Sequence, residues 1–468
     1  MANTSSRNTA AAKMSALAGA TLLASLGISI VTVALPALAR AFSAPVSSVQ
    51  GVVLAYLVSV TVTITLAGKL GDLIGHRRAL MAGLMLFTLA SLFCAAAPTL
   101  GVLIAGRAIQ GLGGAMLLAL PLSIAREVVA KERLGSAMGL IGTVSALGTA
   151  LGPSLGGMLI GELGWRAAFV MLAVLSASTW GLAAWAIPSA APRPIASAKS
   201  LDWLGAATLT TTLVPYALAT LGGKSGFAMD ARLLLALAVV ALGIFIYVES
   251  RAPSPLVPMA LLRDSMTRAS LAMNLLVSTV MMSTLVVGPF FLAYGLGLGE
   301  AETGLVMASG PLVAAFSGIP AGRMTDRFGA QKTLVFGLVQ TTAGLVCLAY
   351  APRALGAAGY VLALMVLTPG FQLFLAANNT AVMSGAEESQ RGMLSGLLGL
   401  SRNLGFMTGA SVMSGLFAHF IGPHGLEGAS SDEVAMAFTM TFLGAVGLGV
   451  MAMLLALSKF GKREESYL

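Results

Sequence analysis

The sequence predicts an all-α protein that crosses a membrane many times. Its 468 residues are 57% hydrophobic and only 10% charged, whereas about 25% of the residues in a soluble domain are charged. The apolar residues gather in runs of roughly 20, the length that crosses a bilayer as a helix. Each run is expected to be helical because hydrocarbon offers no hydrogen-bond partners to free backbone groups.

Apolar runs of this kind follow one another along the whole chain. The first contains "ASLGISIVTVALPALAR" (24–40), and it is too long for the apolar core of a cleaved signal peptide. We place fourteen spans at 14–38, 46–68, 79–97, 101–125, 136–160, 166–187, 203–222, 232–248, 268–295, 303–322, 333–350, 357–382, 393–419 and 434–458.

The charges predict the orientation of these spans. An even number of spans puts both termini on one side, and most of the 27 Lys and Arg residues fall in the tails and loops of that side. The positive-inside rule makes it the cytoplasmic side. Topology therefore accounts for the net charge of +9, and no nucleic-acid partner is expected.

Two pairs of stretches indicate an internal repeat. "GKLGDLIGHRR" (68–78) resembles "GRMTDRFGAQK" (322–332), and "AMGLIGTVSALGTALG" (137–152) resembles "LSGLLGLSRNLGFMTG" (394–409) at a similar offset. Parallel repeats of this kind are a known plan of membrane transporters. We therefore expect two halves of six spans each.

The remaining two spans lie between the halves and are flanked by Pro-rich linkers. The expected organisation is a six-helix bundle over 14–187, two extra membrane helices over 203–248 and a second six-helix bundle over 267–458.

The cytoplasmic loop after the second span is a candidate gate. Glycines bound a tight turn there, and a carboxylate in it could bind the N-terminus of a neighbouring helix and hold one side of the protein shut. The alternative is that the loop only carries positive-inside charge. The candidate gating residues are Gly68, Asp72, Gly75, Arg77 and Arg78, with Asp326 at the matching position of the second half.

Two arginines lie inside predicted spans, where none of the 18 acidic residues falls in the middle third. Arg107 stands about 12 Å from the start of its helix, with Gln110 on the same side, and Arg402 stands near the middle of its own span. A charge inside a membrane is costly and suggests a role in coupling or substrate binding; snorkelling to the interface is the alternative.

Other polar residues inside spans are candidates for lining a cavity. These are Thr32, Asn378 and Asn379. Hydrogen bonding between helices is the alternative role for the two amides.

A glycine face is predicted on the fifth span. In "GTALGPSLGG" (148–157) the glycines recur every four residues, so they share one side of a helix and permit close packing. A proline in the same stretch adds a kink. The residues of this motif are Gly148, Gly152, Pro153, Gly156 and Gly157.

Together these motifs resemble the major facilitator superfamily, and the six–two–six order resembles its fourteen-span drug:proton antiporters. The resemblance implies two bundles that rock around a midplane cavity, with proton uptake driving drug efflux and no cofactor other than the proton gradient. The glycine–proline motif resembles that of exporters. Two positions depart from the family: Leu73 stands where a basic residue is usual, and Gly27 where related antiporters often carry an acid.

We therefore expect a secondary active exporter of small organic molecules in the cytoplasmic membrane, with both termini cytoplasmic. It is expected to be a monomer whose partners are its substrate and lipid. No nucleotide-binding loop, catalytic triad or metal cluster stands in the sequence, which argues against an enzyme. The alternatives are an exporter of anionic or zwitterionic metabolites, a solute importer of the same fold, and a non-transporting sensor or scaffold.

Overall fold

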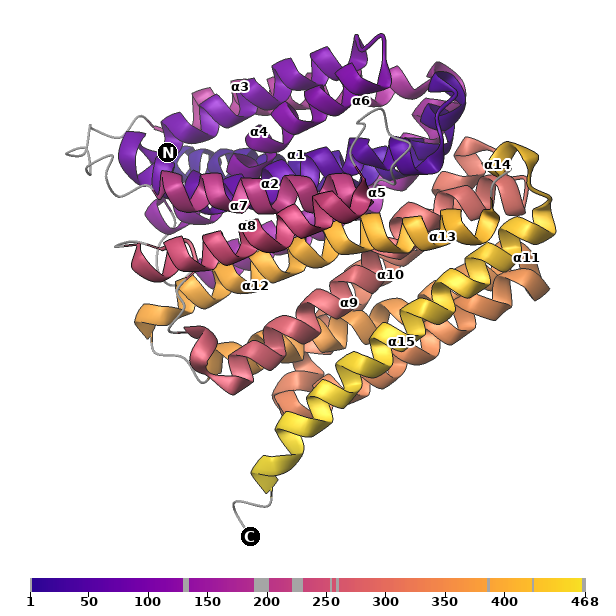
Figure 1. Ribbon diagram of the computed structural model, residues 1–468. Helices are drawn as coiled ribbons and strands as arrows, with labels where there is room; N and C mark the ends of the chain where they lie inside the picture. Colours follow the sequence, from indigo (N-terminus) through magenta and orange to yellow (C-terminus); the bar gives the residue numbers. More distant parts are fainter. Residues whose placement is uncertain are drawn as a thin grey trace. The chain divides into compact units, whose positions relative to one another are not determined.

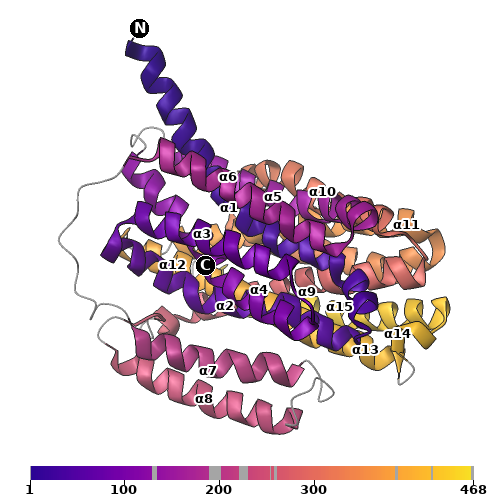
Figure 2. The same cartoon turned by 90° about the horizontal axis from the view of Figure 1, so that it is seen from above.

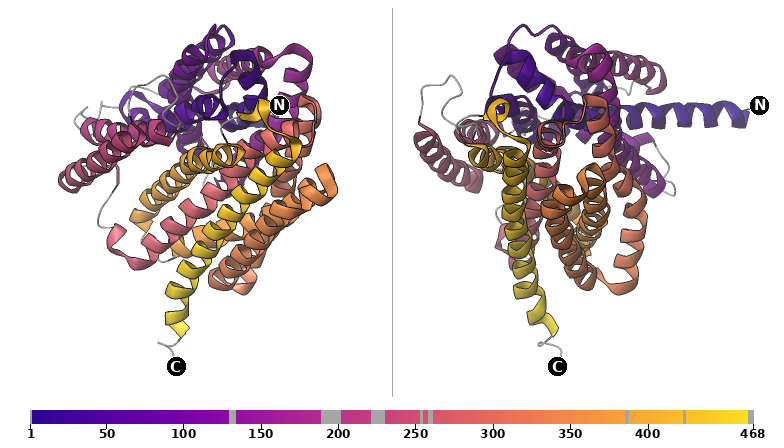
Figure 3. Two further views of the ribbon diagram at one scale, coloured as in Figure 1. Left: turned by 45° about the vertical axis from the view of Figure 1, so that its right-hand side comes forward. Right: turned by 90° about the vertical axis from the view of Figure 1, so that its right-hand side faces the viewer.

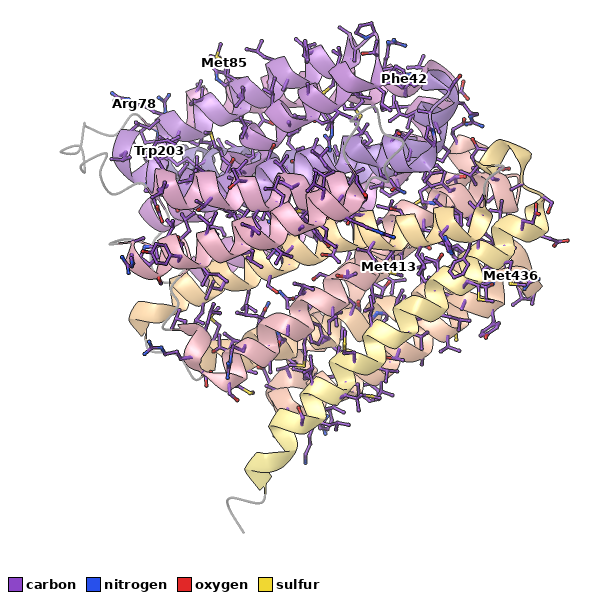
Figure 4. The ribbon with its side chains drawn as sticks, viewed as in Figure 1. Phe42, Arg78, Met85, Trp203, Met413 and Met436 are labelled. Carbon is purple, nitrogen blue, oxygen red and sulfur yellow. The ribbon has the colours of Figure 1, made fainter. Side chains whose placement is uncertain are left out.

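A computed structural model describes residues 2–128, 134–188, 202–220, 230–252, 255–257, 261–384, 388–422 and 425–464. Within these ranges every regular element is helical (Figure 1). Many large apolar side chains point outward, among them Met85 and Trp203, which are 56% and 61% exposed (Figure 4). An outward apolar surface on long helices is what a lipid environment requires.

The first six helices cover the predicted first bundle. They are α1 (Ala2–Phe42), α2 (Val46–Ile74), α3 (His76–Ala95), α4 (Leu100–Val128), α5 (Leu134–Leu163) and α6 (Trp165–Ala186). Of these, α1 packs most extensively against α5, and it also contacts α4 and α6. The first turns of α1 project beyond the neighbouring helices (Figures 2 and 3).

Two further helices follow, α7 (Trp203–Thr220) and α8 (Ala231–Arg251), and they run side by side in Figures 1 and 2. Asp202 precedes α7 and accepts a hydrogen bond of 2.7 Å from the backbone N–H of Gly205. This is the contact by which an acidic N-cap stabilises a helix. Glu249 near the end of α8 is only 2% exposed.

The remaining helices cover the predicted second bundle. They are η3 (Leu261–Arg263), α9 (Ser265–Phe290), the π-helical turn η4 (Phe291–Gly295), α10 (Glu300–Phe328), α11 (Ala330–Ser384), α12 (Glu388–Thr408), the π-helical turn η5 (Gly409–Met413), α13 (Ser414–Ile421), α14 (Gly425–Gly428) and α15 (Ser431–Glu464). A core of small and apolar residues joins α9, α11 and α15.

One long helix contains two of the predicted spans. Gly356 inside α11 has φ 56° and ψ −137°, a conformation that is easy only for glycine. The chain therefore bends there, so that the predicted spans 333–350 and 357–382 fall on either side of the bend. Ten helices in the described ranges are long and apolar enough to cross a bilayer, and Ala330–Met383 is one of them. The count of fourteen spans stays a prediction.

The chain divides into two compact units. The first comprises 1–42, 51–218 and 232–256, and the second comprises 43–50, 219–231 and 257–468. Most of α7 and α8 thus belongs to the first unit. The three-part division at 14–187, 203–248 and 267–458 stays a prediction.

Matching contacts recur in the two units, as the sequence repeat predicts. A β-carbon on Gly148 of α5 would stand 3.0 Å from Cβ of Ser25 on α1, and one on Gly405 of α12 would stand 2.7 Å from Cβ of Ser278 on α9. In each unit a glycine thus lets one helix lie directly against a serine of another. Small residues at crossings allow this close approach in membrane proteins.

Candidate functional site

Arg107 is buried completely inside the first unit. Its Nε donates a hydrogen bond of 3.1 Å to the backbone oxygen of Val52 on α2. Its guanidinium lies 4.2 Å from the centroid of the Tyr56 ring, one turn further along α2. A cation over an aromatic face is attracted by the ring quadrupole, so both contacts tie α4 to α2.

Arg107 and Gln110, which the sequence places on the same side of one helix, contact each other in the structure. Arg107 Nη1 donates to Gln110 Oε1. Gln110 Nε2 donates in turn to Ser91 Oγ on α3 over 2.6 Å, and Ser91 Oγ donates to the Phe87 backbone oxygen over 2.6 Å. The network therefore connects α2, α4 and α3. Arg107 Nη2 has no hydrogen-bond partner among the described residues.

Glycines bring α4 close enough for these contacts. A β-carbon on Gly111 would stand 2.6 Å from the Tyr56 backbone oxygen, and one on Gly113 would stand 2.8 Å from the Gly83 backbone oxygen. The Tyr56 hydroxyl also donates to the Ala24 backbone oxygen on α1 over 3.2 Å. Tyr56 was not predicted as a site residue; its signal in the sequence is the cluster of glycines that accommodates its ring.

Arg402 occupies a different setting in the second unit. Its side chain is exposed and lines a cavity of about 150 Å³. The residues around this cavity are Asn274, Leu375, Asn379, Met383, Leu398, Gly399 and Arg402. They come from α9, α11 and α12 and include no carboxylate.

Of the other predicted cavity residues, Asn379 lines this cavity, and two are buried elsewhere. Asn378 is 0% exposed, and its Nδ2 donates to the Ser270 backbone oxygen over 3.4 Å. Thr32 is 0% exposed, and its Oγ1 donates to the Ser29 backbone oxygen over 2.6 Å. Both side chains are therefore buried among packed helices. Asn274 also lines the cavity and was not predicted as a site residue.

The candidate gating loop joins α2 to α3. Gly75 has φ +94°, and Gly329 at the matching turn of the second half has φ +83°. Arg77 donates from Nε to the Ile187 backbone oxygen over 2.6 Å and from Nη2 to the Ala184 backbone oxygen over 3.0 Å. It therefore caps the C-terminal end of α6, whose dipole favours a cation.

The other members of the loop are placed as follows. Arg78 is exposed (Figure 4), as is Asp326. A β-carbon on Gly68 would point into open space. The side chain of Asp72 lies outside the described part of the structure.

The glycine motif of α5 faces α1. A β-carbon on Gly152 would stand 2.6 Å from Cβ of Ser29 and 2.8 Å from the Ile30 backbone nitrogen, and one on Gly156 would stand 3.0 Å from a methyl carbon of Val33. Pro153 and Gly157 are buried. The motif therefore lies in a close crossing of α5 with α1.

Apolar helices that pack through glycines around buried polar residues are typical of polytopic membrane proteins, transporters among them. The chain belongs to the Major Facilitator Superfamily, which it matches over residues 17–287 and 269–467. The protein is thus a transporter and not an enzyme.

Relatives support this assignment. The uncharacterised transporter YebQ of Escherichia coli is 32% identical over 416 residues, which cover 86% of this chain and 89% of YebQ. The multidrug resistance protein Stp of Mycobacterium tuberculosis is 28% identical over 413 residues, which cover 86% of this chain and 76% of Stp. A solved structure of a bacterial homologue of the human lysosomal transporter Spinster shares the fold, with a TM-score of 0.69 at 14% identity over 96% of both chains.

Proposed function

We propose that the protein is a secondary active exporter of small organic molecules, with fourteen membrane spans and both termini in the cytoplasm. The observation that carries this proposal is the crossing of α1 and α5. There the glycine–proline motif that resembles that of exporters is packed directly against Ser29. The similarity to a protein named as a multidrug resistance protein supports the same direction of transport.

Export is proposed to proceed by alternating access, through rocking of the two halves, and to be driven by proton uptake. The chain has no acidic residue in the middle third of a predicted span. The proton carrier is therefore proposed to be a peripheral carboxylate, such as Asp72 or Glu127, or the substrate itself.

A second candidate function is export of anionic or zwitterionic metabolites. Arg402 favours it, because a cation attracts an anionic group and the described residues that line its cavity include no carboxylate. The two candidates share fold, direction and driving force, and differ in the charge of the substrate.

The proposal is tested in everted membrane vesicles from a host that lacks its own drug exporters. We expect a proton gradient, acidic inside, to drive accumulation of at least one compound from a broad panel, and collapse of the gradient to abolish it. The substrates found this way should also raise the resistance of whole cells. Uptake into intact cells instead of vesicles would assign an importer, and an absence of flux across the panel would favour a sensor or scaffold.

A further inference from the structure

We infer that the cavity between α9, α11 and α12 is a binding subsite for a carboxylate group that has an N–H or O–H donor beside it. The inference rests on the proposed function, because it assigns one end of the transported molecule to this cavity. It uses only residues of the second unit.

The cation of the subsite is Arg402. Its guanidinium is always protonated in proteins, and its planar fork matches the two oxygens of a carboxylate. Among the described residues, none of those that line the cavity is acidic. The positive charge is therefore balanced by a visiting anion or by water, and a carboxylate satisfies the fork better than water because it accepts two charge-assisted hydrogen bonds at once.

The neutral partner of the subsite is Asn274, whose side chain is only 1% exposed. Its Nδ2 donates a hydrogen bond of 2.8 Å to the Leu398 backbone oxygen. Since a carbonyl oxygen only accepts, this contact fixes which end of the amide is nitrogen and leaves Oδ1 as the acceptor. That atom has no hydrogen-bond partner among the described residues, and Asn274 lines the cavity.

A buried acceptor without a donor is costly. We therefore expect a ligand that brings an N–H or O–H donor to Asn274 Oδ1 to bind more tightly than one that does not. Arg402 selects an anionic oxygen and Asn274 selects an N–H or O–H. A carboxylate next to an amide N–H, an ammonium or a hydroxyl carries both features. Asn379 also lines the cavity. Its side-chain amide can donate a hydrogen bond from nitrogen or accept one at oxygen.

The size of the cavity shows how much of a ligand it accepts. Its volume of about 150 Å³ is below the roughly 300–1,000 Å³ of pockets that enclose a drug-sized molecule. The polar head therefore enters, while the rest of the molecule extends beyond it. Leu375, Met383 and Leu398 provide apolar contact for the carbon atoms next to the head.

Gly399 allows a steric test of the subsite. It lines the cavity, and a β-carbon on it would meet no atom within 4 Å. A β-carbon at this position thus enters open space, and a larger side chain is expected to extend into the cavity. Gly399→Leu is expected to block the subsite while leaving the fold intact.

The binding experiment uses the full chain, purified in detergent, with N-acetylphenylalanine as the probe. The matched ligand is N-acetylphenylalaninamide, which has the same shape and N–H group but no charge. We expect titration calorimetry to give wild-type affinity for the carboxylate at least tenfold above that for the amide. Arg402→Gln should remove this preference, whereas Arg353→Gln, at an exposed arginine outside the cavity, should keep it.

Two further variants separate binding from folding. Gly399→Leu should weaken carboxylate binding tenfold or more with an unchanged melting temperature, and Asn274→Leu should weaken it while Arg402 remains. Equal affinity of the wild type for carboxylate and amide, or unchanged binding in Gly399→Leu, would overturn the inference. Selective carboxylate binding without any proton-driven flux would support the subsite and refute the proposed function. Proton-driven drug flux without a preference for the carboxylate would support the proposed function and refute the subsite.

Discussion

The guanidinium of Arg107 lies 4.2 Å from the centroid of the Tyr56 ring, and both side chains are 0% exposed. The cation of the first unit is thus enclosed by protein, whereas Arg402 of the second unit is exposed to a cavity. The two arginines of the predicted spans therefore have different surroundings: Arg107 of α4 contacts α2, and Arg402 lines a cavity.

The first prediction concerns the stability of this buried contact. Arg107→Ala should lower the free energy of unfolding by about 2 kcal/mol or more, because Gln110 and the Val52 carbonyl lose their donor and buried polar groups without partners cost about 1–3 kcal/mol each. A thermal melt of the protein in detergent measures the change.

Variants of Tyr56 provide the matched control. Tyr56→Phe keeps the ring under the guanidinium and loses only the hydroxyl bond to Ala24, so a loss of about 1 kcal/mol is expected. Tyr56→Leu also removes the ring and should cost distinctly more. Equal melting temperatures for these two variants would show that the cation–π contact contributes nothing.

The second prediction concerns the cap of α6. Arg77→Ala should destabilise the end of α6, because the carbonyl oxygens of Ala184 and Ile187 lose their charged donor, and hydrogen bonds to charged groups contribute about 1.5–3 kcal/mol. Hydrogen exchange of the last turn of α6 should become faster. Arg78→Ala, at the exposed neighbour, is the control and should leave that exchange rate unchanged.

The third prediction concerns the backbone of the loop turns. Gly75→Ala places a β-carbon on a residue with φ +94°, a region that costs L-residues about 1 kcal/mol or more. Gly68 lies within α2, and a β-carbon on it would meet no atom within 4 Å. Gly68→Ala should therefore be neutral or slightly stabilising, since alanine is more favourable than glycine in a helix by up to about 1 kcal/mol. Gly75→Ala should therefore lower the melting temperature, whereas Gly68→Ala should leave it unchanged or raise it slightly.

The fourth prediction tests the gate. If the carboxylate of Asp72 holds the cytoplasmic side shut, Asp72→Asn should reduce export sharply while the amount of protein in the membrane stays normal. Asp432→Asn, at an exposed residue in the first turn of α15, should export as the wild type does. Normal flux in Asp72→Asn would refute the gating role.

Hydropathy predicted the helices well because lipid makes helix the only solution for an apolar run. The shared side of Arg107 and Gln110 on α4 was predictable, since residues three apart are neighbours on a helix surface. The hydrogen bond between their side chains was not predicted. Tyr56 was not predictable, because its contact joins two helices whose register depends on packing. Asn378 and Asn379 show the same limit: adjacent residues point in different directions, and only packing decides which one reaches the cavity.

The last prediction concerns the crossing of α1 and α5. Gly152→Ala would put a β-carbon 2.6 Å from Cβ of Ser29 and 2.8 Å from the Ile30 backbone nitrogen, so the helices must separate. Overpacking of this kind typically costs about 1–3 kcal/mol, and Gly152→Leu should cost more and reduce export. Gly181→Ala in α6 is the control, because its β-carbon meets nothing within 4 Å. If both alanine variants melt and export as the wild type does, the crossing does not depend on glycine. If Gly152→Ala melts lower but exports normally, the motif serves stability alone, and the proposed exporter role loses the observation that carries it.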